Sequence, residues 1–492
     1  MTLSPNRFNL IDEAWIPIAA GNRVSLMDVF TRSDLPALGG NAVQKMALLK
    51  LLQAIAQAAC TPQDDAQWRE LGSDGLALRC AAYLTQWHGR FYLYGDKPFL
   101  QMPAISVAAI QPYGAVLPEV ASGNTTVLIQ TQQTPALVDS DKAILLMQLM
   151  GFALGGKKTD NSVVLTPGYT GKFNDKGKSS TGKAGPSLSH LGFLHCVLLG
   201  ETLQQTIWLN LFTQQDIKDK AMFSQGVGTP PWESMPLGEA CGQANLLQHS
   251  LMGRLLPLSR FVLLKENGLH YSEGIQHLDY KAGMHDPSVA VDMSAKKPRA
   301  LWTNPDKRPW RELGGLLAFL AQQKTKDFDC WQMQVGISRV HGAVNSFAVW
   351  CGGLRVSSNA GEQYVSGTDD MVESQIWLES AVLNEMWFSS LQQELTTMEN
   401  QAKKLYACTM AYFKHQKNEG DAAAGQATAL YWNQCEQEFP FLLNACGASE
   451  EDVAKRETWH KKSTGLVQSI YNRMCPNNTP RQMEAWAKHR PR

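Results

Sequence analysis

A run of apolar residues at steps of three and four, beginning at Trp387, constrains the fold of this chain more than any other feature. Apolar residues with this spacing lie on one face of an α-helix. The run extends over about seven helical turns. The sequence therefore predicts a long helix whose apolar seam must pack against other helices. The seam consists of Trp387, Leu391, Leu395, Met398, Ala402, Leu405, Thr409 and Tyr412.

Three more helices are predicted after this one. Residues 427–439 form an amphipathic helix that Pro440 should kink or end, because proline cannot donate its backbone hydrogen bond. Two capping patterns then predict the beginnings of a third helix and a short fourth one. Amphipathic helices joined by short turns are typical of an antiparallel bundle. The capping residues are Ser449 with Asp452, and Thr479 with Gln482.

The chain before about residue 380 has a different character. Residues 43–59 and 142–154 carry apolar residues at helical spacing, and residues 191–212 alternate as two strands would. Residues 347–378 resemble a long hairpin with a polar tip. We therefore predict an α+β chain, with a large mixed α/β globular domain over residues 1–380. A C-terminal antiparallel four-helix bundle is predicted over residues 381–492.

Charge and cysteine content limit the possible functions. The 45 lysines and arginines equal the 45 aspartates and glutamates, so any binding to nucleic acid must come from local patches or from partners. The ten cysteines include no CxxC pair, which excludes the common zinc ribbons and argues against a disulfide scaffold. The N-terminus has no apolar signal region, and no later window approaches 18 uncharged apolar residues. We expect a cytoplasmic protein without a membrane span.

Residues 154–190 are poorly suited to a core because glycine and lysine dominate them. Glycine lets a backbone approach a ligand closely, and lysine supplies a mobile positive charge for phosphate. The stretch contains no nucleotide-binding GxxxxGKS or GxxxxGKT motif. Two interpretations remain open, namely a surface for a nucleic-acid backbone and a solvated insertion without a role. The glycines are 155, 156, 168, 171, 177, 182 and 185, and the lysines are 157, 158, 172, 176, 178 and 183.

The sequence offers no constellation of catalytic residues. It lacks HExxH and GxSxG motifs, and His285–Asp286 precedes a proline in a turn-like setting. His190 and His195 are five residues apart in a region predicted to be a strand, so alternation points them to opposite faces and favours structural roles. These absences favour a binding protein over an enzyme, with no catalytic residue, metal or cofactor. The alternative is a metal-dependent nuclease acting on DNA or RNA, whose carboxylates and histidines meet only on folding.

Several segments together resemble the large subunit of the type I-E CRISPR surveillance complex Cascade, the CasA family. Their order along the chain matches that family from end to end, so the resemblance covers nearly the whole sequence. The segments are FNLIDEAWIPI (8–18), FYLYGDKPFLQMP (91–103), SGNTTVLIQ (122–130), RPWRELGGLLAFL (308–320) and TALYWNQCE (428–436).

This resemblance implies a subunit without catalysis of its own. The family's large subunit sits at the 5′ end of the crRNA, recognises the PAM in the minor groove of target double-stranded DNA, and helps to separate the strands into an R-loop. It then recruits a helicase–nuclease. The implied partners are the backbone, crRNA-handle and small subunits of Cascade, the crRNA, the target DNA and the helicase–nuclease, with no membrane.

The resemblance also implies where the DNA is contacted. The family's glycine loop for the minor groove falls within the stretch from 154 to 190. It matches either Gly155 and Gly156, followed by Lys157 and Lys158, or the Gly182–Lys183–Gly185 segment. We favour the second position because a predicted strand follows directly.

Three further contacts are implied in the same way. The family's lysine finger corresponds to Lys281. Its wedge beneath the PAM falls in residues 357–370, with Asn359 and Gln363 as the candidate amide pair. Its contact with the crRNA handle and the neighbouring subunit corresponds to Leu128, Ile129 and Gln130, with an aliphatic side chain where the family has an aromatic one.

Overall fold

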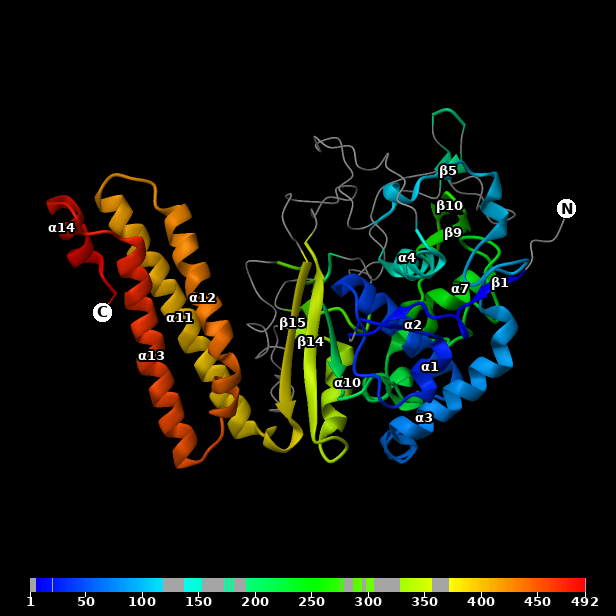
Figure 1. Cartoon of the computed structure of the whole chain (residues 1–492), viewed down its shortest axis with the longest axis horizontal. Helices are drawn as coiled ribbons and strands as arrows, with labels where there is room; N and C mark the ends of the chain where they lie inside the picture. The colour runs from blue at the N-terminus through cyan, green and yellow to red at the C-terminus, as the bar shows by residue number, and fades with distance from the viewer. Residues whose placement is uncertain are drawn as a thin grey trace. The chain divides into compact units, whose positions relative to one another are not determined.

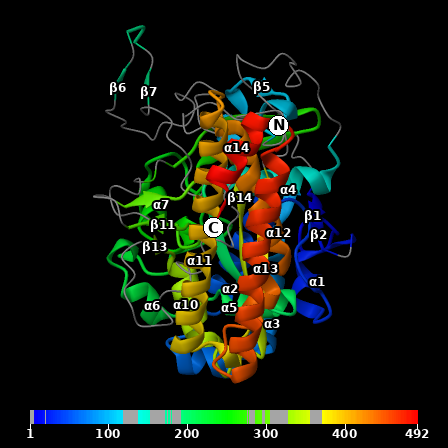
Figure 2. The same ribbon diagram turned by 90° about the vertical axis from the view of Figure 1, so that its left-hand side faces the viewer.

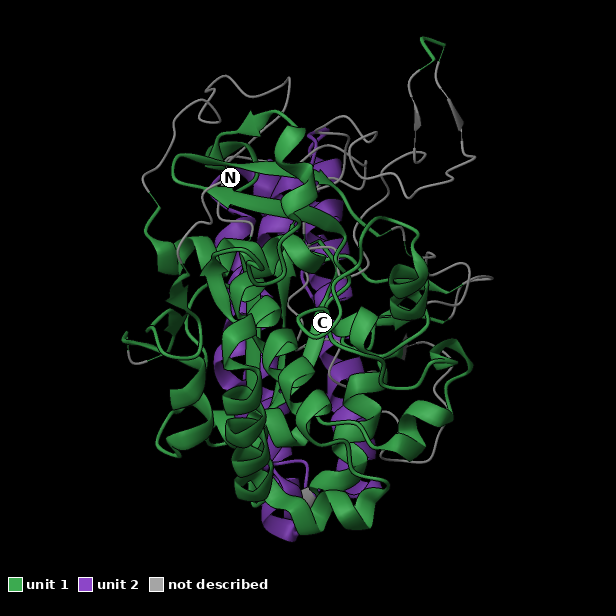
Figure 3. Ribbon diagram, turned by 90° about the vertical axis from the view of Figure 1, so that its right-hand side faces the viewer, with its two compact units in different colours: residues 1–310, 326–377 green, residues 311–325, 378–492 purple. Residues whose placement is uncertain are grey.

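The computed structural model describes most of the chain, and the side-chain and backbone statements below refer to this part. The described residues are 6–19, 21–117, 137–152, 172–173, 175–177, 179–180, 192–275, 277, 286–293, 298–304, 328–355 and 371–491. Within them the chain separates into two compact units, with the division between Trp377 and Leu378 (Figure 3). We call these the first unit and the helical unit.

Helix α2 (Ala42–Ala59) is the central helix of the first unit. It begins with a capping box in which Asn41 and Gln44 satisfy each other's backbone amides. Most of its residues are buried on every side, because it packs against helices α3, α4, α5 and α8 and against strand β14. The surrounding helices are α1 (Leu26–Thr31), α3 (Asp65–Trp87), α4 (Asp139–Gly151), α5 (Leu203–Leu209), α6 (Gln214–Lys218), α7 (Gly242–Gln248), α8 (Met252–Leu255) and α10 (Trp331–Val340).

Small antiparallel sheets complete the first unit. The predicted hairpin over residues 347–378 is confirmed, because β14 (Ser346–Leu354) and β15 (Met371–Glu379) are neighbours in a sheet of order β15–β14–β8 (Figure 1). Strand β8 (His195–Leu199) pairs with β14 from His195 opposite Gly352 to Leu199 opposite Ala348. Two other three-stranded sheets have the orders β5–β10–β9 and β12–β11–β13. The strands of these two sheets are β5 (Ile110–Gln111), β9 (Arg260–Lys265), β10 (Gly268–Glu273), β11 (Val291–Asp292), β12 (Arg299–Ala300) and β13 (Phe328–Asp329). Two-stranded ladders join β1 (Arg7–Asn9) to β4 (Tyr92–Tyr94) and β2 (Ile16–Pro17) to β3 (Arg23–Val24).

The prediction of two strands over residues 191–212 is wrong in its second half. Strand β8 ends at Leu199, and the residues from Leu203 to Leu209 form helix α5. Thr202 starts this helix, because its side chain accepts a hydrogen bond from the backbone of Gln205. Most of α5 is buried, so its apolar residues on several sides obscure the helical period.

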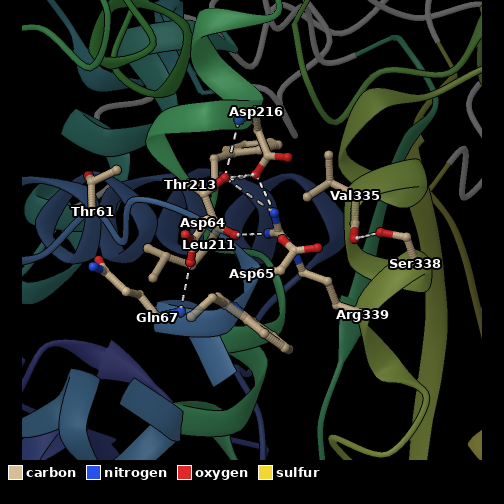
Figure 4. A network of polar contacts seen from close by, with 12 residues as sticks. Thr61, Asp64, Asp65, Gln67, Leu211, Thr213, Asp216, Val335, Ser338 and Arg339 are labelled. Atoms are coloured by element: carbon tan, nitrogen blue, oxygen red, sulfur yellow. Dashed lines mark hydrogen bonds and ion pairs between the residues drawn. The ribbon is translucent and has the colours of Figure 1, made fainter. Parts of the chain in front are cut away.

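Arg339 of helix α10 ties three elements of the first unit together (Figure 4). Its side chain is 2% exposed and forms ion pairs with Asp65 of α3, at 2.7 Å, and with Asp216 of α6. It also donates a hydrogen bond to the carbonyl oxygen of Leu211 at 2.9 Å. The guanidinium lies 5.5 Å from the ring of Trp68, within cation–π range. This one side chain therefore joins residues separated by 274 positions in the sequence.

The helical unit contains α11 (Glu385–His415), α12 (Asp421–Asn444), α13 (Glu450–Met474) and α14 (Pro480–His489). All eight residues of the predicted α11 seam are buried, and both predicted capping boxes form. The three long helices pack against one another and run in alternating directions (Figure 1). Helix α14 packs on α11 but is only ten residues long, so a bundle of four comparable helices stays a prediction. Pro440 lies inside α12 and does not end it.

Candidate nucleic-acid interface

The residues predicted to contact nucleic acid all lie outside the described part of the chain, so their roles stay predictions. They are Gly155, Gly156, Lys157 and Lys158; Gly182, Lys183 and Gly185; Lys281; Asn359 and Gln363; and Leu128, Ile129 and Gln130. The structure does describe residues that immediately flank several of these segments, and these flanking residues form specific buried contacts.

A short hairpin lies inside the glycine- and lysine-rich stretch. Strands β6 (Lys172–Phe173) and β7 (Ser179–Ser180) pair antiparallel around an exposed turn, and both are labelled in Figure 2. Gly177 in this turn has a φ of 69°, in the left-handed region that favours glycine. The stretch therefore includes a short two-stranded ladder. The sequence did not predict it, because these residues show no strand period.

The strands on either side of the predicted wedge are fixed to helix α2. Residues 356–370 connect β14 to β15, and Glu373 of β15 accepts a hydrogen bond from the indole of Trp350 at 2.8 Å. The same carboxylate pairs with Lys45 of α2 at 2.5 Å. Both side chains of this pair are partly exposed, so its contribution to stability is modest. The contacts nevertheless connect both strands of the hairpin to α2.

A buried ion pair lies directly after the segment that contains Lys281. Lys50 of α2 approaches both carboxylate oxygens of Asp286 at 2.8 Å, and the two side chains are 2% and 0% exposed. Ser288 donates to Asp286 from its backbone amide at 3.0 Å and from its hydroxyl at 2.8 Å. Burial lowers the pKa of Lys50, and the charge of Asp286 opposes that shift. The carboxylate is thus held by several donors and is itself buried.

A second contact lies just before the same segment. Arg254 of α8 is fully buried and donates from Nη1 to Nδ1 of His277 at 2.8 Å. Since Nδ1 accepts this bond, the ring proton resides on Nε2, which donates to the carbonyl oxygen of Pro257 at 2.7 Å. Lys50 also approaches the carbonyl oxygen of Arg254 at 3.4 Å, which links the two contacts. Residues 278–285 are therefore flanked on both sides by one connected set of polar side chains, of which Lys50, Asp286 and Arg254 are buried.

We predict that His277 makes the first unit sensitive to acid. Burial and the charge of Arg254 lower the pKa of His277 from 6.5 to about 3. Below pH 6.5 the unfolded chain binds a proton at this imidazole while the folded chain does not, so stability falls until the pH reaches about 3. The loss is at most about 1.4 kcal/mol for each pH unit, because the folded and unfolded states differ by at most one proton at this imidazole. Above pH 6.5 this residue has no effect.

Urea unfolding of the wild type and of His277→Gln, at pH 7 and pH 5, measures this effect. The wild type should lose about 1–2 kcal/mol more than the variant over this interval. Equal pH dependence in the wild type and in His277→Gln would contradict the prediction.

Sequence patterns indicate these buried polar groups only weakly. Lys50 lies in the apolar run from Met46 to Leu52, and a charge inside such a run is a signal for a buried partner. The sequence does not identify that partner, because Asp286 is 236 residues away. His195 is buried in β8, and its Nδ1 lies 3.0 Å from the Ser288 hydroxyl. This position agrees with the structural role expected for it.

Among the residues that the structure describes, no group of three or more histidine, cysteine, aspartate and glutamate side chains is arranged to hold a metal ion. No helix in this part of the chain combines the length and apolar character needed to cross a membrane. All ten cysteines are free thiols.

Known proteins resemble the chain in sequence and fold. The family model described as CRISPR-associated protein Cse1 matches residues 9–470. A curated relative, the CRISPR-associated protein CasA/Cse1 of Thermus thermophilus, is 27% identical over 339 residues. That match covers 64% of this chain and 61% of the relative, so the aligned part spans less than two thirds of the relative's length.

Two solved structures extend the similarity to almost the whole chain. The crystal structure of Thermobifida fusca Cse1 has a TM-score of 0.75 and 18% identity, covering 98% of this chain and 93% of that one. A chain from a structure titled as a CRISPR RNA-guided surveillance complex has a TM-score of 0.74 and 16% identity, covering 99% of both chains. At these identities the two likenesses establish a shared fold.

Proposed function

The chain belongs to the CRISPR-associated Cse1 family, and from that membership we propose that it is the non-catalytic large subunit of an RNA-guided surveillance complex of the Cascade type. The observation that carries this proposal is the match of the family model to residues 9–470. It is supported by the shared fold with a chain of a CRISPR RNA-guided surveillance complex. The proposed partners are the backbone, crRNA-handle and small subunits, the crRNA, the target DNA and the helicase–nuclease.

Within this complex we propose that the chain recognises a PAM in the minor groove and promotes strand separation. In RNA-guided systems the protein reads a short duplex tag, and base pairing with the guide reads the remaining sequence. The minor groove presents a degenerate pattern of donors and acceptors, so small and cationic groups suit a reader that tolerates several tags. The glycines and lysines of residues 155–185, Lys281, and the Asn359–Gln363 wedge are the proposed contacts.

The neutral overall charge is consistent with a protein that reads only a short duplex tag and leaves the remaining recognition to the guide RNA. Equal numbers of acidic and basic residues give the isolated chain little general attraction for DNA. We therefore expect weak binding by the chain alone and strong binding in the complex. The buried contacts around residues 278–285 support the assignment of Lys281, since a finger that reads a groove needs a rigid base.

We predict that Lys281→Ala weakens the binding of PAM-containing duplex by the assembled complex without impairing assembly. Loss of one phosphate contact should reduce the slope of log affinity against log salt concentration by about 0.9. Binding isotherms at several salt concentrations measure both quantities. Lys218→Ala, which removes an exposed lysine of α6 in the same unit, serves as the control and should leave both unchanged. Unchanged affinity and slope in Lys281→Ala would remove this residue from the proposed interface.

The proposed membership of a complex has its own test. A tagged copy of the chain, expressed with its native operon, should co-purify with a crRNA and with the other Cascade subunits. Recovery of the folded chain without RNA and without partners would overturn the proposal.

The absence of catalysis is tested separately. The purified chain should leave double-stranded DNA and RNA intact in the presence of magnesium or manganese. Metal-dependent cleavage that is lost in an acid-to-alanine variant would support the alternative, a nuclease.

A further inference from the structure

Two segments proposed to contact DNA are attached to one connected set of contacts in the first unit. Residues 153–191 contain the glycine- and lysine-rich stretch, and residues 278–285 contain Lys281. Contacts among described residues join the positions at which these two segments begin and end. These positions are Phe152 and Gly192 for the first segment, and His277 and Asp286 for the second.

The two ends of the first segment meet through a pair of rings. The ring of Phe152, which directly follows α4, lies 5.1 Å from the imidazole of His195 in β8. Both side chains are buried. Because His195 follows Gly192 by three residues, this contact brings together the chain before and after residues 153–191.

A hydrogen-bonded chain leads from His195 to the end of the second segment. Ser288 donates its only hydroxyl proton to Asp286 at 2.8 Å, so its oxygen accepts the hydrogen bond that it shares with Nδ1 of His195 at 3.0 Å. Nδ1 therefore carries a proton. The backbone supports the same link, because Cys196 donates its amide to the carbonyl oxygen of Ser288 at 2.7 Å. The side chains of His195, Ser288 and Asp286 are all buried.

Lys50 connects the two ends of the second segment. Its ammonium group pairs with Asp286 at 2.8 Å and approaches the carbonyl oxygen of Arg254 at 3.4 Å. Arg254 in turn donates from Nη1 to Nδ1 of His277 at 2.8 Å. The residues directly before and after 278–285 are thus joined through one buried ammonium group.

The start of the second segment also connects to the start of the first. Nε2 of His277 donates to the carbonyl oxygen of Pro257 at 2.7 Å. Ser259, two residues later, donates its backbone amide to the carbonyl oxygen of Met150 at 2.8 Å. Met150 lies two residues before Phe152, so the contacts return to the point where residues 153–191 begin.

We propose that Ser288 and His195 are positioning residues for PAM recognition, and that they make residues 153–191 and 278–285 act as a single reader. This inference rests on the proposed function. Contacting groups must be held to within about 0.5 Å by supporting hydrogen bonds, and a buried polar network in which each member has a partner provides such support. Because both side chains are buried, they act through the two segments and not by touching DNA.

A double-mutant cycle of Ser288→Ala and Lys281→Ala in the assembled complex tests this proposal. Affinity is measured for a duplex carrying the PAM that the wild-type complex selects from a randomised library, and for a duplex without it. Ser288→Ala should weaken binding of the PAM duplex by about 5-fold, the equivalent of one hydrogen bond, and leave binding of the other duplex unchanged. On the Lys281→Ala background it should add less than about 2-fold, because the two residues act together.

The histidine provides a second pair of variants. His195→Leu removes the donor to Ser288 and should reduce PAM discrimination as Ser288→Ala does. The side-chain amide of His195→Asn can replace the Nδ1 donor, so this variant should retain most of the discrimination. Equal discrimination in the leucine and asparagine variants would contradict a role for the hydrogen bond.

Ser259→Ala is the matched control. In the described part of the chain its buried hydroxyl has no hydrogen-bond partner, and the substitution keeps the backbone bond to Met150, so PAM discrimination should equal that of the wild type. Size-exclusion chromatography verifies that each variant assembles. Wild-type discrimination in Ser288→Ala would overturn the inference, as would a 5-fold effect that persists on the Lys281→Ala background. Absence of any PAM preference in the wild-type complex would overturn the proposed function as well.

Discussion

Replacement of Lys50 by methionine is expected to destabilise the first unit by about 3–5 kcal/mol, because it leaves the carboxylate of Asp286 buried without its counter-charge. The side chains of the pair are 2% and 0% exposed, so water cannot compensate for the missing ammonium group. Urea unfolding followed by tryptophan fluorescence measures the shift. The transition of the helical unit should stay in place, which separates this effect from general destabilisation.

Two comparisons test the physical reason. Lys45→Met removes a lysine of the same helix whose partner, Glu373, is partly exposed, and it should cost no more than about 1 kcal/mol. The double variant Lys50→Met, Asp286→Asn removes both charges and should recover a large part of the lost stability. Equal losses for Lys45→Met and Lys50→Met would contradict the assignment of a buried, uncompensated charge.

Replacement of Arg339 by methionine should cost about 3 kcal/mol, the lower end of the range for a broken buried ion pair. Methionine keeps much of the side-chain volume but removes the contacts to Asp65, Asp216 and the Leu211 carbonyl oxygen. The expected loss of stability is smaller than for Lys50→Met, because the Asp65 side chain is 69% exposed and water can hydrate its carboxylate once the arginine is removed. Chemical unfolding under the conditions used for Lys50→Met provides the measurement.

Arg339→Lys distinguishes the geometry of the guanidinium from its charge. A lysine ammonium is a point charge and cannot present the planar fork that serves two carboxylates and a carbonyl oxygen together. We expect an intermediate loss for this variant, and less than about 1 kcal/mol for Asp65→Asn at the exposed end of the network. Wild-type stability of Arg339→Lys would show that the positive charge alone, without the planar guanidinium, accounts for the stabilisation.

Local sequence patterns predicted the helical unit better than the first unit. The α11 seam and the Ser449 and Thr479 caps depend on residues three or four positions apart, and all of them form as predicted. Pro440 was expected to kink or end its helix, and it does not end α12, which continues to Asn444. Only four residues, about one helical turn, follow the proline in this helix.

In the first unit, contacts between distant residues decide the structure. Helix α5 looked like a strand because its residues are buried on several sides, and burial on all sides removes the period that identifies a helix. Lys50 and Arg339 showed no partner in the sequence, since Asp286 and Asp65 are more than 200 positions away. The proposed DNA contacts came from family resemblance, because short glycine- and lysine-containing segments have no periodicity from which a fold can be read.

The ion pair between Lys50 and Asp286 has a consequence for folding during synthesis on the ribosome. The two residues are 236 positions apart in the sequence. Because ribosomes add about 5–20 residues per second, Asp286 is synthesised roughly 10–50 s after Lys50. During that time helix α2 carries an uncompensated ammonium group that disfavours its burial. The native burial of α2 around Lys50 is therefore expected to follow the synthesis of Asp286.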